Sequence, residues 1–123
     1  GHVANLPFWL YATMTGDFYD LTAGDKEATL AAPETRQELL ETFDDKAKKG
    51  RASLAAATDA QMMAPWALKN NGQELFSMPR VAVVRSFVMN HLIHHRGQLS
   101  VYLRLNDVPV PSIYGPSADE GQM

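Results

Sequence analysis

The sequence contains no cysteine among its 123 residues. It can therefore form no disulfide, and it offers no thiolate to a metal ion. A transition metal bound by this chain would have to be held by nitrogen and oxygen atoms. This absence directs attention to the four histidines as candidate metal ligands.

Basic residues are outnumbered as well. Eleven Lys and Arg against 14 Asp and Glu give a formal net charge of −3, which provides no long-range attraction to a phosphate backbone. The basic residues gather only in one short run, Lys46, Lys48, Lys49 and Arg51. We therefore expect no nucleic-acid partner.

Long apolar runs are also lacking. No stretch approaches the roughly 18 apolar residues that a membrane-spanning helix needs. The start, Gly1-His2-Val3, has neither the basic segment nor the cleavage site of a secretory signal. We expect no membrane partner and a cytoplasmic location. Because the chain lacks an initiator methionine and begins as if inside an element, we also expect residues upstream of Gly1.

The N-terminal half predicts two helices. Residues 3–14 are apolar and aromatic, and Pro7 is compatible with a helix there only near its start or at a kink. Residues 15–33 contain the glycines and aspartates typical of a loop. Thr35 and Glu38 then fit a capping box, and apolar residues recur at helical spacing up to Thr58.

The C-terminal half predicts a turn, a long helix and a tail. Residues 66–69 and 73–76 are short extended runs around an Asn-Asn-Gly turn, which predicts a small hairpin or an irregular flap. Pro79 suits the first turn of a helix that continues to about Leu105. The prolines at 109, 111 and 116 then favour an extended surface tail. We expect one domain, residues 1–123.

Two histidines lie on the apolar stripe of the long helix. His91 and His95 are four residues apart, so their rings project from one helix face, close enough to bind one ion. With this spacing alone, ordinary hydrogen-bonding roles are the more common outcome. A buried stripe is a costly place for two imidazoles, however, unless their ring nitrogens are satisfied. His94 points roughly 60° away from His91 and is assigned to the surface or to a supporting position.

Two segments of the chain resemble the DinB-like (DinB/YfiT-like) family. The run from Asn90 to Arg104, followed by prolines and Tyr114-Gly115-Pro116, is similar to the C-terminal signature of these proteins. At the other end, His2 followed by Pro7-Phe8-Trp9 resembles the second-helix motif of the family. Together the two segments bracket nearly the whole chain.

This resemblance implies an all-α fold, an antiparallel four-helix bundle that often forms a homodimer. It also implies a divalent metal ion, nickel or zinc, held by His2, His91 and His95. The family's first helix would precede His2 and is absent from the chain as given. Such a bundle would leave an apolar groove open unless upstream residues or a partner filled it, and we expect upstream residues.

Two functions follow from such a site. The resemblance to the thiol-transferase branch implies a metal-dependent enzyme, a thiol transferase or a hydrolase, acting on a small-molecule thiol or another small substrate. The alternative is a non-catalytic metal-binding module of the stress response. An exchangeable water on the ion would favour the enzyme, and a fourth protein ligand would favour the module. No catalytic residue is assigned.

Other conspicuous residues are interpreted as structural. Four aromatic residues are more typical of a core than of a substrate pocket, and three acids on one helix are more typical of a solvated face than of a site. These are Trp9, Trp66, Phe76 and Tyr102, and Glu41, Asp44 and Asp45. Gly97, inside the predicted long helix, suggests a close approach of another backbone, in the bundle or across a dimer interface, unless it is a tolerated local defect.

Overall fold

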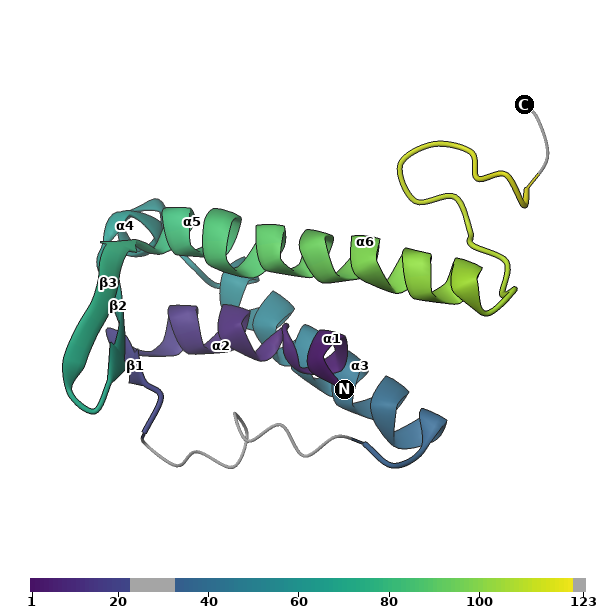
Figure 1. The fold of residues 1–123 in the computed structure, drawn as a ribbon. Coiled ribbons are helices and arrows are strands. Elements are labelled where there is room, and N and C mark those ends of the chain that lie inside the picture. Colours follow the sequence, from purple (N-terminus) through teal and green to yellow (C-terminus); the bar gives the residue numbers. More distant parts are fainter. Residues whose placement is uncertain (23–32, 121–123) are drawn as a thin grey trace. The chain divides into compact units, whose positions relative to one another are not determined.

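The computed structural model describes residues 1–22 and 33–120 of the chain (Figure 1). The chain divides into two compact units, Gly1–Leu92 and Ile93–Met123. The loop expected over residues 15–33 lies largely outside the described residues.

The first unit opens with two short helices, α1 (His2–Asn5) and α2 (Phe8–Thr15). Pro7 stands between them as the residue that caps α2, and the backbone N–H of Trp9 donates to the carbonyl of Leu6. Because proline has no N–H to continue the α1 hydrogen bonds, the helix predicted over residues 3–14 is interrupted at this point. Pro7 therefore lies at the start of a helix, which is one of the two positions that the sequence allowed.

Helix α3 (Arg36–Ala55) begins at the predicted capping box. The Glu38 N–H donates to Thr35 Oγ1 at 3.1 Å, and the Thr35 N–H donates back to Glu38 Oε2 at 3.2 Å. The helix ends before the predicted boundary because Thr58 starts a second capping box, which opens α4 (Asp59–Met63).

Helices α2 and α3 pack closely at Gly50. A Cβ atom built on Gly50 would lie 3.0 Å from the carbonyl oxygen of Pro7 and 3.1 Å from Cβ of Leu10. A Cβ built on Gly97, where the sequence had suggested such an approach, meets no atom of the described chain within 4 Å. The close backbone approach within the described chain is therefore at Gly50, and an approach to Gly97 across a dimer interface stays a prediction.

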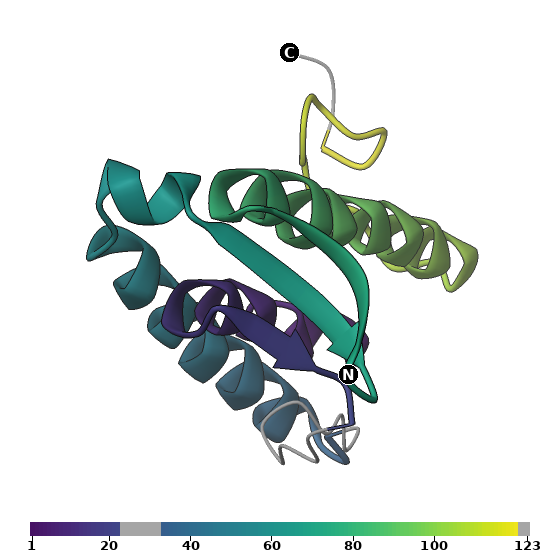
Figure 2. The same ribbon diagram turned by 90° about the vertical axis from the view of Figure 1, so that its left-hand side faces the viewer.

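A three-stranded sheet forms one end of the first unit (Figure 2). Its order is β1 (Phe18–Asp20), β2 (Pro65–Asn70), β3 (Gln73–Pro79), with β1 parallel to β2 and β2 antiparallel to β3. The predicted hairpin is confirmed. Asn71 and Gly72 both have positive φ, 51° and 75°, as the favoured two-residue hairpin turn requires.

The expected all-α four-helix bundle is wrong, because the fold is a mixture of helices with a mixed sheet. The missed element is β1, which has only three residues and follows Gly16 in a segment with loop composition. The Asp20 carboxylate at its end accepts hydrogen bonds from the backbone N–H groups of Asn71 and Gly72, at 3.1 and 2.7 Å. Contacts between residues about 50 positions apart thus complete the sheet. A repeat of apolar residues over a few positions cannot predict such contacts.

The core of the first unit lies against this sheet. Trp66 and Val83 are fully buried and Leu68 nearly so, and the Trp66 indole N–H donates to the carbonyl of Ala12 at 3.2 Å. Partly buried hydrophobic residues pack around them: Trp9, Tyr19, Phe76, Met78 and Phe87. Three of the four conspicuous aromatic residues, Trp9, Trp66 and Phe76, therefore belong to the core, as expected.

The buried Arg80 closes the end of α2. Its Nε donates to the carbonyl of Thr13 at 2.9 Å, and its Nη2 donates to the carbonyl of Gly16 and to the Asp17 carboxylate. These carbonyls lie at the C-terminal end of a helix, where they have no intrahelical partner. The guanidinium thus joins the end of α2 to the start of the long helical segment that begins at Arg80 itself.

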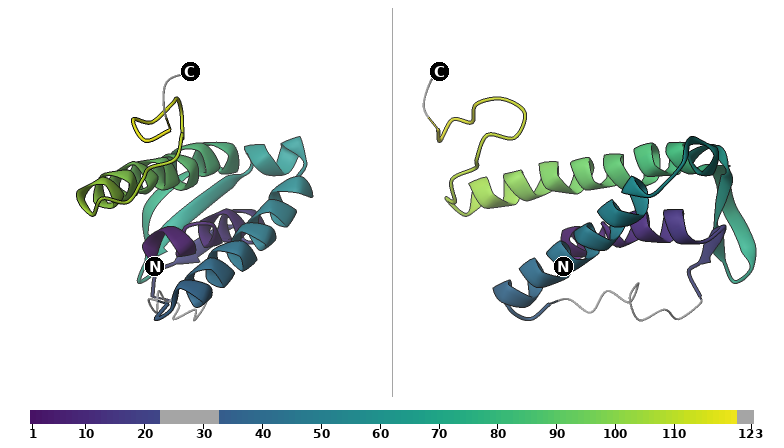
Figure 3. Two further views of the ribbon diagram at one scale, coloured as in Figure 1. Left: turned by 90° about the vertical axis from the view of Figure 1, so that its right-hand side faces the viewer. Right: turned by 180° about the vertical axis from the view of Figure 1, so that it is seen from behind.

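The predicted long helix is helical throughout (Figure 3). It is not uniformly α, however. Pro79 ends β3, and α5 (Arg80–Ala82), the π-helix η1 (Val83–Met89) and α6 (Asn90–Leu105) follow without a break. No residue of α6 is buried, and Tyr102 is 62% exposed. We expected His91 and His95 to face a buried interior, but both side chains are only half-buried.

The second unit consists of the rest of α6 and a looped tail. No helix or strand occurs among the described residues 106–120, as the prolines predicted. The tail is looped rather than extended, however. The Asp119 carboxylate accepts hydrogen bonds from Arg104 Nη1 at 3.0 Å and from the Val110 N–H at 2.9 Å.

Within the part of the chain that the structure describes, no helix is both long and apolar enough to cross a membrane.

Candidate metal centre

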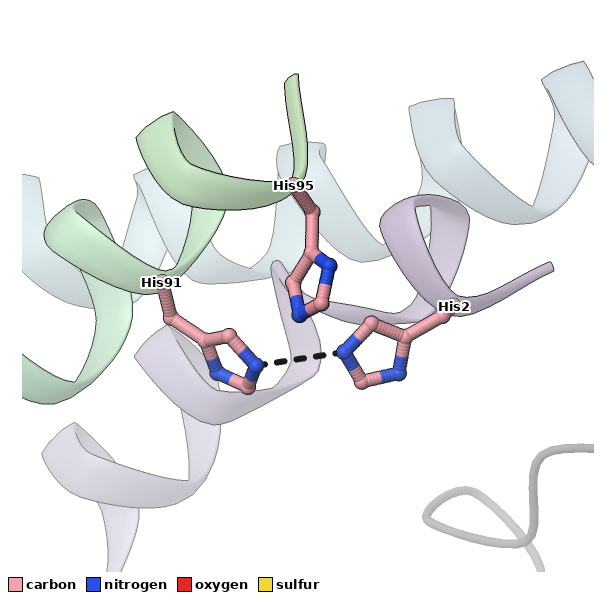
Figure 4. Close-up of side chains that lie close together, drawn as sticks. All are labelled: His2, His91 and His95. Carbon is pink, nitrogen blue, oxygen red and sulfur yellow. Dashed lines mark hydrogen bonds between the residues drawn. The ribbon is translucent and has the colours of Figure 1, made fainter. Parts of the chain in front are cut away.

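Two histidines far apart in sequence meet in the first unit. His2 is the first residue of α1, and His91 is the second residue of α6. Their Nε2 atoms are 3.2 Å apart, and their ring centroids are 5.1 Å apart (Figure 4). In two neutral rings, this hydrogen bond needs one Nε2 that carries hydrogen and one that accepts it.

The distance between these nitrogens also suits a shared metal ion. Two ligands at about 2.0–2.1 Å from a tetrahedral ion are about 3.3–3.4 Å from each other, as the tetrahedral angle requires. The observed 3.2 Å lies close to that value. The pair could therefore bind an ion with a small rotation of either ring.

His95 follows His91 by one helical turn on α6 and extends from the same helix face (Figure 4). One nitrogen from each of His2, His91 and His95 lies within 4.8 Å of the others. Within the first unit, the structure brings together His2 and His91, two of the three histidines that the resemblance implied. His94 is not in the group, and its ring contacts that of His95 edge-on at a centroid distance of 4.9 Å.

No acidic residue joins this group among the described residues. Glu41, Asp44 and Asp45 lie exposed on α3, as expected for a solvated face. The donor set is therefore three imidazoles, which are neutral when they bind a metal and leave its positive charge uncompensated.

A polar anchor holds the short helix that carries His2. The Asn5 side-chain amide donates to the carbonyl of Gly1 at 2.9 Å, and Lys46 Nζ on α3 donates to Asn5 Oδ1. Asn5 is buried, as are its neighbours Ala4 and Leu6. A four-residue helix has little stability of its own, so these contacts with α3 fix the position of His2. No local pattern in the sequence indicates the contact with α3, because Asn5 and Lys46 are 41 residues apart.

Aromatic rings support His91 from the preceding π-helix. The Phe87 ring centroid lies 6.0 Å from that of His91 and 5.3 Å from that of Trp9. His91 is therefore linked to the aromatic core through Phe87. π-Helical segments are rare and occur often at functional sites, and η1 ends directly before the α6 residues that carry the histidines.

The chain belongs to the DinB family, whose model matches residues 9–122. The match confirms the resemblance drawn from the sequence. It includes His91 and His95 and begins after His2, so the family match itself does not cover that ligand candidate.

A curated relative matches a shorter segment. The chain is similar to a protein of Bacillus subtilis (strain 168) described as uncharacterized protein YrdA, with 47% identity over 34 residues. The similar segment is 28% of this chain and spans only 20% of the length of YrdA. No solved structure matches the chain.

Proposed function

We propose that this protein binds one divalent metal ion, nickel or zinc, through His2, His91 and His95 and acts as a metal-dependent enzyme. The observation that carries the proposal is the approach of two Nε2 atoms to 3.2 Å from elements 89 residues apart in sequence. Two imidazole nitrogens at this distance have the spacing of two ligands on one tetrahedral ion, and packing alone does not require that spacing.

The chemistry of the donor set fits such an ion. Neutral imidazole suits both zinc and nickel. Three protein ligands leave at least one coordination position for water or substrate, as in catalytic rather than structural zinc sites. When bound, the ion would supply Lewis-acid chemistry, which can lower the pKa of a bound water to about 7.

The chain's own residues would hold this site in place. Asn5 and Lys46 fix the helix of His2, and Phe87 packs beside the ring of His91. Resemblance to the thiol-transferase branch of the family favours a small-molecule thiol as a substrate. Hydrolysis of a small substrate is the other proposed reaction class.

A homodimer is part of the same proposal, and light scattering at micromolar concentration tests it.

The first experiment measures metal content. Protein purified without a nickel column should contain or take up close to one equivalent of nickel or zinc, as measured by elemental analysis. His91→Ala should lose most of the bound metal, since two remaining imidazoles form a poor chelate. His94→Ala is the matched control and should keep it. Loss of metal in the His94 variant with retention in the His91 variant would show that the ligand assignment is wrong.

The second experiment asks whether the bound ion is catalytic. Metal-loaded protein, metal-free protein and His91→Ala should be compared in thiol conjugation to an electrophile and in ester and amide hydrolysis. Turnover in the metal-loaded wild type alone would support the enzyme. Tight metal binding without turnover, and without an exchangeable water on the ion, would instead support the non-catalytic metal-binding module.

A further inference from the structure

The His95 ring has a hydrogen-bond partner on its own helix. Gln98 lies three residues further along α6, within the range where helix neighbours interact, and its Oε1 is 2.8 Å from Nδ1 of His95. The two nitrogens of the ring are thus distinguished: Nδ1 faces the amide oxygen of Gln98, and Nε2 does not.

The chemistry of this contact determines where the ring carries its hydrogen. An amide oxygen only accepts hydrogen bonds, so Nδ1 must be the protonated nitrogen. A neutral imidazole carries one ring hydrogen. Nε2 of His95 therefore presents a lone pair, which is the form that a metal ligand needs.

We propose that Gln98 is a positioning residue that holds His95 in the tautomer able to bind the metal ion through Nε2. This inference rests on the proposed metal site. Partners of this kind orient ligating histidines and increase their basicity in known metal sites, and their loss weakens metal affinity by roughly 10–100-fold. The Gln98 side chain is exposed, so it contributes little packing, and its removal can be separated from unfolding.

The experiment uses the full chain and three variants. Gln98→Leu removes the acceptor at similar size, Gln98→Glu restores an acceptor oxygen, and Gln73→Leu, at an exposed position on β3, is the matched control. Histidine ring nitrogens are followed by ¹⁵N NMR in the metal-free protein. Zinc affinity is then measured by competition with a chromogenic chelator.

In the wild type, His95 should show the Nδ1–H tautomer. Gln98→Leu should shift this ring toward the Nε2–H form and weaken zinc binding by about 10–100-fold, with an unchanged melting temperature. Gln98→Glu should retain the wild-type tautomer. Its zinc affinity should be close to that of the wild type or higher. Gln73→Leu should change neither readout.

The outcomes separate this inference from the proposed function. Wild-type protein that binds no zinc or nickel would overturn the metal site and this inference with it. Zinc binding that is equally tight in wild type and Gln98→Leu, or an Nε2–H tautomer at His95 in the wild type, would overturn the role of Gln98 alone and leave the metal site standing.

Discussion

The two units of the chain differ in how they bury side chains. Every buried apolar residue in the described part of the chain belongs to Gly1–Leu92, except Val110. In Ile93–Met123, large apolar side chains of α6 are exposed, with Leu105 at 75%. Burial of apolar area is the main favourable contribution to folding, so the first unit carries most of the chain's own stabilisation.

This difference bears on the histidines. His2 and His91 lie in the unit with the core, where α3 and the aromatic cluster fix their positions. His95 lies just beyond the division and is positioned by α6 and by Gln98. The support of His95 can therefore be changed without altering the core, whereas the positions of His2 and His91 depend on it.

The largest expected effect is at Trp66. Trp66→Ala removes a fully buried side chain and leaves the carbonyl of Ala12 without its indole partner. The free energy of unfolding should fall by about 3–5 kcal/mol, as measured by denaturant titration. Leu105→Ala, at an exposed position in the second unit, should stay within about 0.5 kcal/mol of the wild type. Equal losses at both positions would contradict the comparison.

A pair of glycines gives a smaller and more selective test. Gly50→Ala introduces a Cβ against Pro7 and Leu10, and such overpacking should destabilise the chain by about 1–3 kcal/mol. Gly97→Ala introduces a Cβ into open space inside α6, where the higher helix propensity of alanine should stabilise by up to about 1 kcal/mol. Thermal unfolding distinguishes the two signs. Stabilisation by Gly50→Ala would mean that α2 and α3 do not approach as described.

The smallest expected effect is pH-dependent and concerns Asp20. Hydrogen bonds from Thr22, first from its side chain, and from the backbone of Thr22 and Gly72 lower the pKa of Asp20 to about 2. Because the folded pKa lies below the ordinary value of 3.8, this carboxylate contributes stability above about pH 4. That contribution is lost as the pH falls from 4 toward 2.

The matching measurement is the melting temperature between pH 5 and pH 2. Asp20→Asn should lower it at pH 5 and flatten its decline toward pH 2, relative to the wild type. Asp44→Asn, at an exposed position on α3, should leave the profile unchanged. A decline in Asp20→Asn as steep as that of the wild type would rule out this assignment.

Local signals in the sequence predicted the local structure well. The capping box at Thr35, the position of Pro7 at a helix start and the hairpin turn at Asn71 each depend on residues within a few positions of one another, and each is confirmed. Strand β1 and the buried Arg80 depend on partners 49 and 67 positions away, so neither could be predicted. The fold class was wrong for this reason.

The candidate site shows the same division. The four-residue spacing of His91 and His95 is a local signal and put both on one helix face. His2 begins the aromatic-rich segment at the other end of the chain and lies in the motif of the family resemblance, but nothing in the residues near it indicates a partner 89 positions away. The supports of the site, Asn5 with Lys46 and Gln98, were missed, although the spacing of Gln98 from His95 could have suggested the latter.

The π-helix η1 directly precedes α6 and so determines the direction in which the side chains of α6 extend from the helix axis. Each residue of an α-helix turns the chain by about 100°, and η1, with its wider turn, begins at the buried Val83 and ends two residues before His91. A chain one residue shorter in this segment would rotate His91 by about that angle and turn its Nε2 away from His2. Insertions and deletions between Val83 and Met89 are therefore far less tolerable than their position outside the ligand set suggests. Substitutions that keep the length preserve the direction of these side chains.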